Sequence, residues 1–203
     1  MSGLFDDGAE LERLSLPDAD VQMLRQLPLQ ASDASILRRL IDETGWRQEN
    51  VVVWGKSHPQ PRLIAWHGDA GKNYSYSGIA MNPVPWTPLL EELRAVVEPL
   101  AGERFNSVLL NYYRDARDSM GYHSDDEREL GPEPTIASVS FGEVRDFVFK
   151  HKSKGMKPVR VPLLSGSLLL MKGPTQANWK HGIEKSTRPM GPRVNLTFRR
   201  ILG

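Results

Sequence analysis

The sequence predicts an α+β fold that is mainly β, with short strands forming a sandwich or barrel and helices lying outside it. From residue 106 onward, short segments rich in aliphatic, β-branched and aromatic residues are separated by Gly, Pro or charged residues. Such a series is typical of sandwiches and barrels. Before residue 106, two segments instead have the apolar spacing of amphipathic helices.

The first helix is predicted within residues 32–46. Ser32 or Asp33 can serve as its N-cap. Its apolar residues fall on one face, namely Ile36, Leu37, Leu40 and Ile41. The second helix is predicted within residues 87–102, where Thr87 can cap, Pro88 suits the first helical position and Gly102 follows the end. Its helical spacing is kept by Leu89, Leu93, Val96 and Leu100.

Six strands are predicted in the second half, at residues 106–114, 135–142, 146–152, 159–164, 166–171 and 193–201. Between two of them lies a stretch that we call the basic turn, defined by its cationic residues Lys150, Lys152, Lys154, Lys157 and Arg160. We expect this turn at the tip of a hairpin.

Composition sets limits on function. The 203 residues fit one domain, and 26 Lys plus Arg against 25 Asp plus Glu leave a net charge of +1, which by itself favours no charged partner. The absence of cysteine excludes thiol catalysis, thiolate zinc sites and disulfides. The first residues lack the apolar core of a signal peptide, and no apolar run approaches the ~20 residues that span a membrane. We therefore expect no membrane partner and a cytoplasmic location, or a nuclear one in a eukaryote.

Strand periodicity places polar residues together near the C-terminus. Alternate residues of a strand face the same side, so one face of residues 193–199 carries Arg193, Asn195, Thr197 and Arg199, while Val194, Leu196 and Phe198 face the core. The same rule puts Asn111 and Tyr113 on one side of their strand. Two guanidiniums, a phenol and amides suit a small dianion, because arginine binds carboxylates through paired hydrogen bonds.

The stretch "GYHSDDEREL", residues 121–130, indicates a metal site. His123 and Asp125 lie two residues apart, as two ligands of a facial triad of two histidines and a carboxylate could, a triad typical of mononuclear iron(II) oxygenases. His181 is the best third ligand, because it lies between an apolar strand and the strand with two arginines, whereas His151 lies in the basic turn and His58 and His67 precede the β-rich half. Each of these residues alone could equally be a solvated side chain at the surface, but their combination in this order favours a metal site.

The segments "HSDDERE", "IASVSFG", "RDFVFKHK", "GSLLLM" and "PRVNLTFRRI" together resemble the AlkB family of Fe(II)/2-oxoglutarate dioxygenases. The resemblance runs over about residues 51–201 and is strongest to the branch that repairs alkylated bases in duplex DNA. It implies a double-stranded β-helix, or jelly roll, over residues 51–203, with a nucleotide-recognition lid at about residues 51–82. Residues 1–50 are expected to form an N-terminal helical extension packed on the same domain.

The resemblance also implies roles for individual residues. The iron ligands, which form the catalytic centre, would be His123, Asp125 and His181. Arg193 and Arg199 would bind the carboxylates of 2-oxoglutarate, with each arginine's partner left open. Further hydrogen bonds to this cosubstrate would come from Asn111, Tyr113 and Asn195. Contacts to the DNA substrate would come from Trp54, Arg62, Tyr74, Tyr76, Ser77 and Glu127.

The implied reaction consumes O2 and 2-oxoglutarate and oxidises the N-methyl group of 1-methyladenine or 3-methylcytosine. The hydroxylated group leaves as formaldehyde, and succinate and CO2 are the other products. A carboxylate at Glu127, or at Asp126 beside it, would favour these bases because alkylation makes them cationic. The base would leave the stack to reach the iron. The basic turn would contact phosphates. The expected protein is a monomer that acts on double-stranded DNA and also on single strands.

Two other classes fit part of the pattern. One is an Fe(II)/2-oxoglutarate hydroxylase or demethylase acting on RNA, protein or a small molecule, which would use the same iron and cosubstrate residues. The aromatic residues of the lid and the basic turn argue against it. The other is a catalytically silent nucleic-acid binder, against which the complete triad and both arginines argue.

Overall fold

Two antiparallel β-sheets form the body of the protein in a computed structural model that describes residues 10–53, 56–71, 74–76, 79–81, 83–153 and 155–202. The large sheet contains, in spatial order, β1 (Glu12–Leu14), β2 (Asp20–Leu24), β13 (Ser167–Lys172), β10 (Ile136–Gly142), β15 (Arg193–Arg199), β8 (Ser107–Tyr113) and β5 (Leu63–Gly68). The small sheet contains β12 (Val159–Leu163), β11 (Arg145–His151), β14 (Trp179–Ile183) and β9 (Met120–His123).

The chain winds between these sheets from β8 to β15. Strands β8, β10, β13 and β15 belong to the large sheet, and β9, β11, β12 and β14 belong to the small one. From β8 to β15, every connection except β11–β12 therefore crosses from one sheet to the other, as in a jelly roll. All six predicted strands are present. Two further short strands of this region, β9 and β14, were not predicted.

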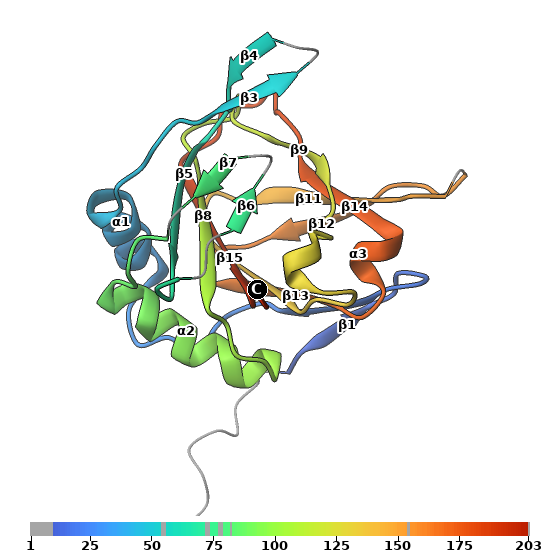
Figure 1. The fold of residues 1–203 in the computed structure, drawn as a ribbon, viewed down its shortest axis with the longest axis horizontal. Coiled ribbons are helices and arrows are strands. Elements are labelled where there is room, and N and C mark those ends of the chain that lie inside the picture. The colour runs from blue at the N-terminus through green and yellow to red at the C-terminus, as the bar shows by residue number, and fades with distance from the viewer. Residues whose placement is uncertain are drawn as a thin grey trace, which may run out of the picture.

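Two helices cover the outer face of the large sheet (Figure 1). Helix α1 (Asp33–Glu43) begins at the N-cap Ser32, whose side chain accepts a hydrogen bond from the backbone N–H of Ser35. Helix α2 (Pro88–Ala101) has Thr87 as its N-cap and ends at Gly102, where φ is 65° and the backbone is left-handed. Both predicted helices are confirmed. The predicted apolar face of α2 is slightly rotated, because Leu89, Leu93 and Val97 are buried while Val96 is half-buried.

The large sheet is buried on both faces, which explains the long apolar runs of its strands. Val108, Leu110 and Leu196 pack with α1 and α2 in one core. Leu109 and Leu169 face the other way and pack with Phe149 of the small sheet in the second core. The remaining helical segments are α3 (Thr175–Asn178), which lies beside the small sheet, and the 3-10 turn η1 (Arg128–Leu130).

The expected helical extension at residues 1–50 is wrong for its described first part. Residues 20–24 form β2, which pairs with β13 from Asp20↔Lys172 to Leu24↔Leu168, and β1 pairs with β2 in turn. The physical reason is that β13 would otherwise be an exposed sheet edge, and the backbone of β2 pairs with it. Strand β2 also contributes three buried side chains, those of Val21, Met23 and Leu24. Within residues 10–50, only α1 is helical.

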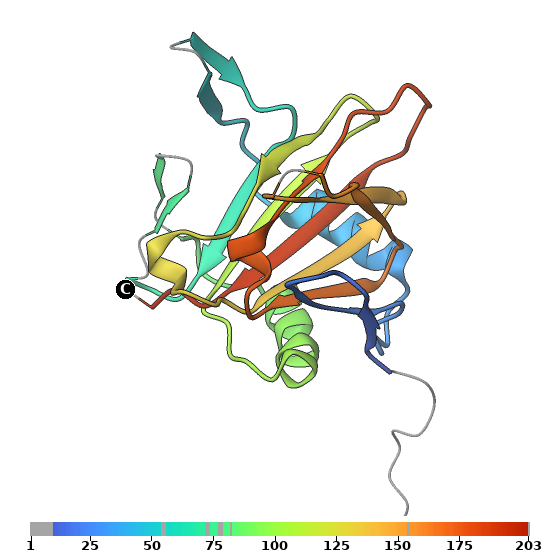
Figure 2. The same cartoon turned by 90° about the vertical axis from the view of Figure 1, so that its right-hand side faces the viewer.

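Two small ribbons stand apart from the sandwich, on the same side of it in Figure 2. One pairs β3 (Asn50–Val53) with β4 (Lys56–Pro59), and the other pairs β6 (Tyr74–Tyr76) with β7 (Ile79–Met81). Apart from Asn50, both ribbons fall within residues 51–82, the segment for which a nucleotide-recognition lid is predicted. Among the described segments, no helix has both the length and the apolar character needed to span a bilayer.

Candidate metal and cosubstrate site

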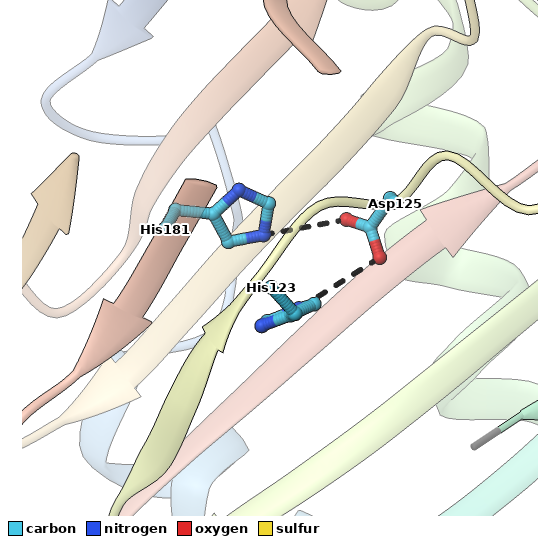
Figure 3. A group of neighbouring side chains, drawn as sticks. All are labelled: His123, Asp125 and His181. Carbon is cyan, nitrogen blue, oxygen red and sulfur yellow. Dashed lines mark ion pairs between the residues drawn. The ribbon is translucent and has the colours of Figure 1, made fainter. Parts of the chain in front are cut away.

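Three predicted ligands meet on the inner side of the small sheet. His123 ends β9, Asp125 follows two residues later, and His181 lies in the middle of β14. Strands β9 and β14 are neighbours, with His181 opposite His123, so the pairing brings together two residues that are distant in sequence. One potential ligand atom from each of the three residues lies within 4.8 Å of the others. Asp125 faces both rings, at 3.9 Å from His123 Nε2 and 3.5 Å from His181 Nε2 (Figure 3).

The loop that carries Asp125 is held by neighbours on the α3–β14 segment. The backbone N–H of Asp125 donates to Gln176 Oε1 at 2.9 Å, and Ser124 Oγ donates to the Trp179 carbonyl oxygen at 2.9 Å. His123 Nδ1 lies 3.0 Å from the carbonyl oxygen of Gly121, which fixes its ring and leaves Nε2 toward Asp125. Such contacts to the ring nitrogen opposite the ligand atom are usual around metal-binding histidines.

The protonation states suit a divalent cation. Burial, reinforced by the nearby His181 ring, lowers the pKa of His123 to about 4, so this imidazole is neutral near pH 7. Burial opposes ionisation of Asp125, but the charge of Arg199 and the two histidines outweigh it and hold the pKa of this carboxyl well below its usual range. The imidazole of His123 and the carboxylate of Asp125 therefore need no further deprotonation to act as ligands, and His181 supplies a second imidazole nitrogen beside them. This donor set fits iron(II).

Arg199 joins the triad directly. Its Nη2 lies 2.5 Å from Asp125 Oδ1, and the side chains of the two residues are 5% and 1% exposed. The ion pair places the guanidinium of Arg199, which belongs to β15, beside the triad. Removing either partner would leave the other charge buried, which is costly.

Arg193 lies farther from the triad, on the same face of β15. Its Nη2 donates to Ser140 Oγ at 2.8 Å, while its Nε and Nη1 are buried and have no acceptor among the described residues. Its guanidinium lies 5.1 Å from the centre of the Tyr113 ring. Burial lowers the pKa of Arg193 to about 10, and Tyr113 opposes that shift. A buried cation with two donors that have no acceptor in the described part of the chain fits an anionic group such as a carboxylate.

A single pocket connects these groups. Its lining includes the triad and every polar residue predicted for the cosubstrate, namely Asn111, Tyr113, Arg193, Asn195 and Arg199. The two-residue periodicity of β15 is confirmed, because Arg193, Asn195, Thr197 and Arg199 all line it. Asn195 already uses its amide hydrogens, donating to Ser138 Oγ and to the Val139 carbonyl oxygen.

A profile of the 2OG-Fe(II) oxygenase superfamily matches residues 20–199. The chain belongs to this superfamily. It is 51% identical over 159 residues to "DNA oxidative demethylase ALKBH2" of Homo sapiens, a match that covers 75% of this chain and 61% of the human protein. It is 42% identical over 175 residues to "Alpha-ketoglutarate-dependent dioxygenase alkB homolog 3" of Mus musculus, covering 82% of this chain and 60% of that protein.

These relatives confirm the resemblance to the AlkB family, and the chain spans about 60% of their length. Among solved structures, that of OsALKBH1 superposes with a TM-score of 0.64 at 18% identity, covering 93% of this chain and 100% of that one. At this identity the likeness supports the fold alone. The superfamily uses iron(II) and 2-oxoglutarate, and the triad and the pocket with two buried arginines are the groups of this chain that fit them.

The predicted DNA contacts are placed only in part. Trp54 and Ser77 lie outside the described residues, and of Tyr74 and Tyr76 only the backbone, in β6, is described. Glu127 is half-buried at the N-cap of η1, where its side chain does not cap the turn. Arg62 is not at the surface but buried beside Asn111.

The basic turn is partly engaged within the protein. Lys152 Nζ donates to the Gln176 carbonyl oxygen at 2.8 Å and to Asp126 Oδ2 at 3.1 Å. Arg160 Nη2 donates to Glu184 Oε2 at 2.7 Å, and Lys150 lies 3.6 Å from the centre of the Tyr122 ring. Lys157 is exposed, and Lys154 lies outside the described residues.

Four supporting side chains were not predicted from the sequence. Ser138 and Ser140 of β10 face Asn195 and Arg193, and their alternation in "IASVSFG" could have placed them on the pocket side. Gln176 had no such signal, because it lies in a four-residue helix without periodicity. The buried Arg145, which donates to the backbone carbonyls of Asp118 and Glu184, was also missed.

Proposed function

We propose that this protein is an Fe(II)- and 2-oxoglutarate-dependent oxidative demethylase that removes alkyl groups from N-alkylated DNA bases such as 1-methyladenine and 3-methylcytosine. The observation that carries the proposal is the meeting of His123, Asp125 and His181 beside a pocket with two buried arginines. The chain that carries this site is 51% identical to a DNA oxidative demethylase, which supports DNA as the substrate. The double-stranded β-helix proposed for residues 51–203 is supported by the winding of β8 to β15.

His123, Asp125 and His181 would hold the iron and leave its other positions open. When bound with 2-oxoglutarate and O2, iron(II) supplies the oxidising chemistry that hydroxylates the N-alkyl group, with formaldehyde, succinate and CO2 as products. The protein keeps the imidazole of His123 neutral and Asp125 ionised, and it orients Asp125 through Gln176. The walls of the pocket include the apolar side chains of Phe147, Met171 and Ile183, which would reduce contact of the bound groups with water.

The two arginines are proposed to take different ends of 2-oxoglutarate. Arg199 contacts Asp125, so it would suit the carboxylate of 2-oxoglutarate that is next to the keto group and would lie nearer the iron. Arg193 is paired with Ser140, beside Tyr113, and its two buried donors without acceptors suit the distant carboxylate. Tyr113 lines the same pocket and can donate its hydroxyl hydrogen to that carboxylate.

Recognition of DNA is proposed to involve the ribbons β3–β4 and β6–β7 and the loop after Asp125. Glu127 follows Asp125 by two residues, and a carboxylate there would favour a cationic alkylated base over a neutral normal one. Trp54, Tyr74, Tyr76 and Ser77 would contact the flipped base or the gap that it leaves, in duplex DNA first and in single strands as well. The protein is proposed to act as a monomer.

The test is the coupling of succinate formation to DNA repair. The protein is supplied with iron(II), ascorbate and 2-oxoglutarate, and duplexes with 1-methyladenine, 3-methylcytosine or no lesion are compared. We expect succinate and formaldehyde in equal amounts with the methylated duplexes alone. Matched RNA oligonucleotides test the alternative substrate, and turnover of RNA but not DNA would overturn the proposal.

A further inference from the structure

Arg62 is a buried arginine in the part of the chain expected to face DNA. It follows β4 and precedes β5, and only 5% of its surface is exposed. Its Nε donates to Asn111 Oδ1 at 2.7 Å, and its Nη1 donates to the Ser119 carbonyl oxygen at 3.4 Å. The segment is anchored beside that contact, because the Ser119 N–H donates to the Pro61 carbonyl oxygen at 2.8 Å. Arg62 is therefore part of the wall behind the pocket.

The contact with Arg62 decides how the carboxamide of Asn111 is turned. A guanidinium has donors only, so the Asn111 atom that faces it at 2.7 Å is the carbonyl oxygen, and the amide nitrogen points away. Asn111 lines the cosubstrate pocket, and its Nδ2 makes no hydrogen bond with the described part of the chain. The amide hydrogens of Asn111 are thus available to a ligand.

Asn195 provides a comparison within the same pocket. It lies directly opposite Asn111 on the neighbouring strand β15. Both of its amide hydrogens are used, by Ser138 Oγ at 2.8 Å and by the Val139 carbonyl oxygen at 2.9 Å, and its Oδ1 accepts from Thr197 Oγ1. Of the two amides, Asn111 is therefore the one that can donate to a bound oxygen atom.

We propose that Arg62 is a positioning residue for the cosubstrate rather than a DNA contact. By donating to Oδ1, it holds the Asn111 carboxamide with Nδ2 toward the pocket, where an oxygen of a dicarboxylate can accept. The opposite orientation would turn a carbonyl oxygen toward an anion and repel it. The identity of the ligand, 2-oxoglutarate, rests on the proposed function; the orientation of Asn111 does not.

The test is a double-mutant cycle with 2-oxoglutarate binding as its readout. The protein is loaded with Mn(II), which supports binding without turnover, and affinity is measured by calorimetry. Arg62→Met keeps the apolar stem but removes the donors, and we expect roughly tenfold weaker binding. Asn111→Ala should weaken binding to a similar degree. In the Asn111→Ala background, Arg62→Met should have no further effect, because its partner is already absent.

Asn111→Asp separates orientation from folding. It keeps an acceptor for Arg62, so the buried cation retains a partner, but it replaces the pocket-facing N–H groups with a carboxylate oxygen. We expect at least tenfold weaker binding of 2-oxoglutarate by this variant even if Arg62→Met proves too unstable to measure. Arg47→Met is the matched control, since Arg47 is an exposed arginine of the same region, and it should bind like the wild type.

Three results would overturn the inference: wild-type affinity in Asn111→Asp, additive losses in the cycle, or an Arg62→Met variant that loses DNA affinity while binding 2-oxoglutarate normally. DNA affinity is followed by fluorescence anisotropy on the same samples. Failure of the wild type to demethylate DNA would defeat the proposed function but leave the binding cycle valid. Failure of the wild type to bind 2-oxoglutarate at all would defeat both.

Discussion

The side-chain oxygen of Gln176 accepts a hydrogen bond from the backbone N–H of Asp125 at 2.9 Å. Gln176 is 1% exposed, and its Nε2 faces the sulfur of Met171 at 3.6 Å. The amide therefore connects the triad carboxylate to α3, 51 residues away in sequence. Because nothing else among the described residues accepts from this N–H, Gln176 holds the backbone of Asp125, while Arg199 holds its side chain.

Gln176→Leu should weaken metal binding by about 10- to 100-fold, the usual effect of losing a group that orients a ligand. The metal-free protein should also lose about 1–3 kcal/mol of unfolding free energy, because the Asp125 N–H is left buried without an acceptor. Metal affinity is measured by competition of Co(II) with a chromophoric chelator. Gln30→Leu, at an exposed position, is the control. Unchanged Co(II) affinity in Gln176→Leu would show that Asp125 is held by other contacts.

The sequence was sufficient to predict groups whose signal is local or periodic. His123 and Asp125 form a two-residue motif, and the four polar residues of β15 follow a period of two that the strand geometry imposes. Gln176 could not be predicted in this way, since its function comes from a contact across the fold. Residues 20–24 are too short a segment to reveal by pattern that they complete the edge of the large sheet. The burial of Arg62 likewise depends on how residues 60–62 dock against Ser119.

Two triad residues, Asp125 and His123, should differ in their effect on stability. Replacing any residue of the triad with Ala should abolish turnover. Asp125→Ala should also lower the unfolding free energy of the metal-free protein by about 3–5 kcal/mol, because the buried Arg199 loses this carboxylate. His123→Ala should cost about 1 kcal/mol, since its ring is 26% exposed and pairs with no buried cation. Urea unfolding of chelator-treated protein measures the difference, and equal losses would contradict the role of the Arg199 pair.

Arg193 and Arg199 should be separable by two binding measurements. Arg193→Met should weaken 2-oxoglutarate binding at least tenfold while Co(II) affinity stays at the wild-type value, because Arg193 contacts Ser140 and not the triad. Arg199→Met should weaken both, because it also removes the ion pair with Asp125. DNA affinity should stay within twofold of the wild type for Arg193→Met. A loss of Co(II) affinity in Arg193→Met would place that arginine nearer the metal than proposed.

Salt dependence should identify which residue of the basic turn contacts phosphate. Lys157 is exposed and has no hydrogen bond or ion pair within the described part of the chain, whereas Lys152 is bonded to Asp126 and to the Gln176 carbonyl. Lys157→Gln should therefore flatten the slope of log affinity against log salt by roughly one unit. Arg38→Gln, on α1 across the large sheet, should leave the slope unchanged. A slope equal to that of the wild type in Lys157→Gln would remove this residue from the interface.

The duplex preference can be tested at Trp54, which lies outside the described residues and follows β3 in sequence. The prediction rests on the sequence "VVVWGK" and on the resemblance to the duplex-repair branch, in which an aromatic residue here fills the gap left by the flipped base. Unstacking a base costs a few kcal/mol, and stacking on an aromatic ring returns about 1–3 kcal/mol. We expect Trp54 to be exposed in the DNA-free protein.

Trp54→Ala should reduce demethylation of a lesion in duplex DNA by about tenfold or more, because the gap in the helix is no longer filled. Demethylation of the same lesion in a single strand should change by less than twofold, since a single strand has no gap. The two substrates serve as each other's control, because a general loss of folding or of iron would lower both rates equally. Equal losses on duplex and single-stranded DNA would therefore show that Trp54 does not act in the gap, and would remove this support for a duplex substrate.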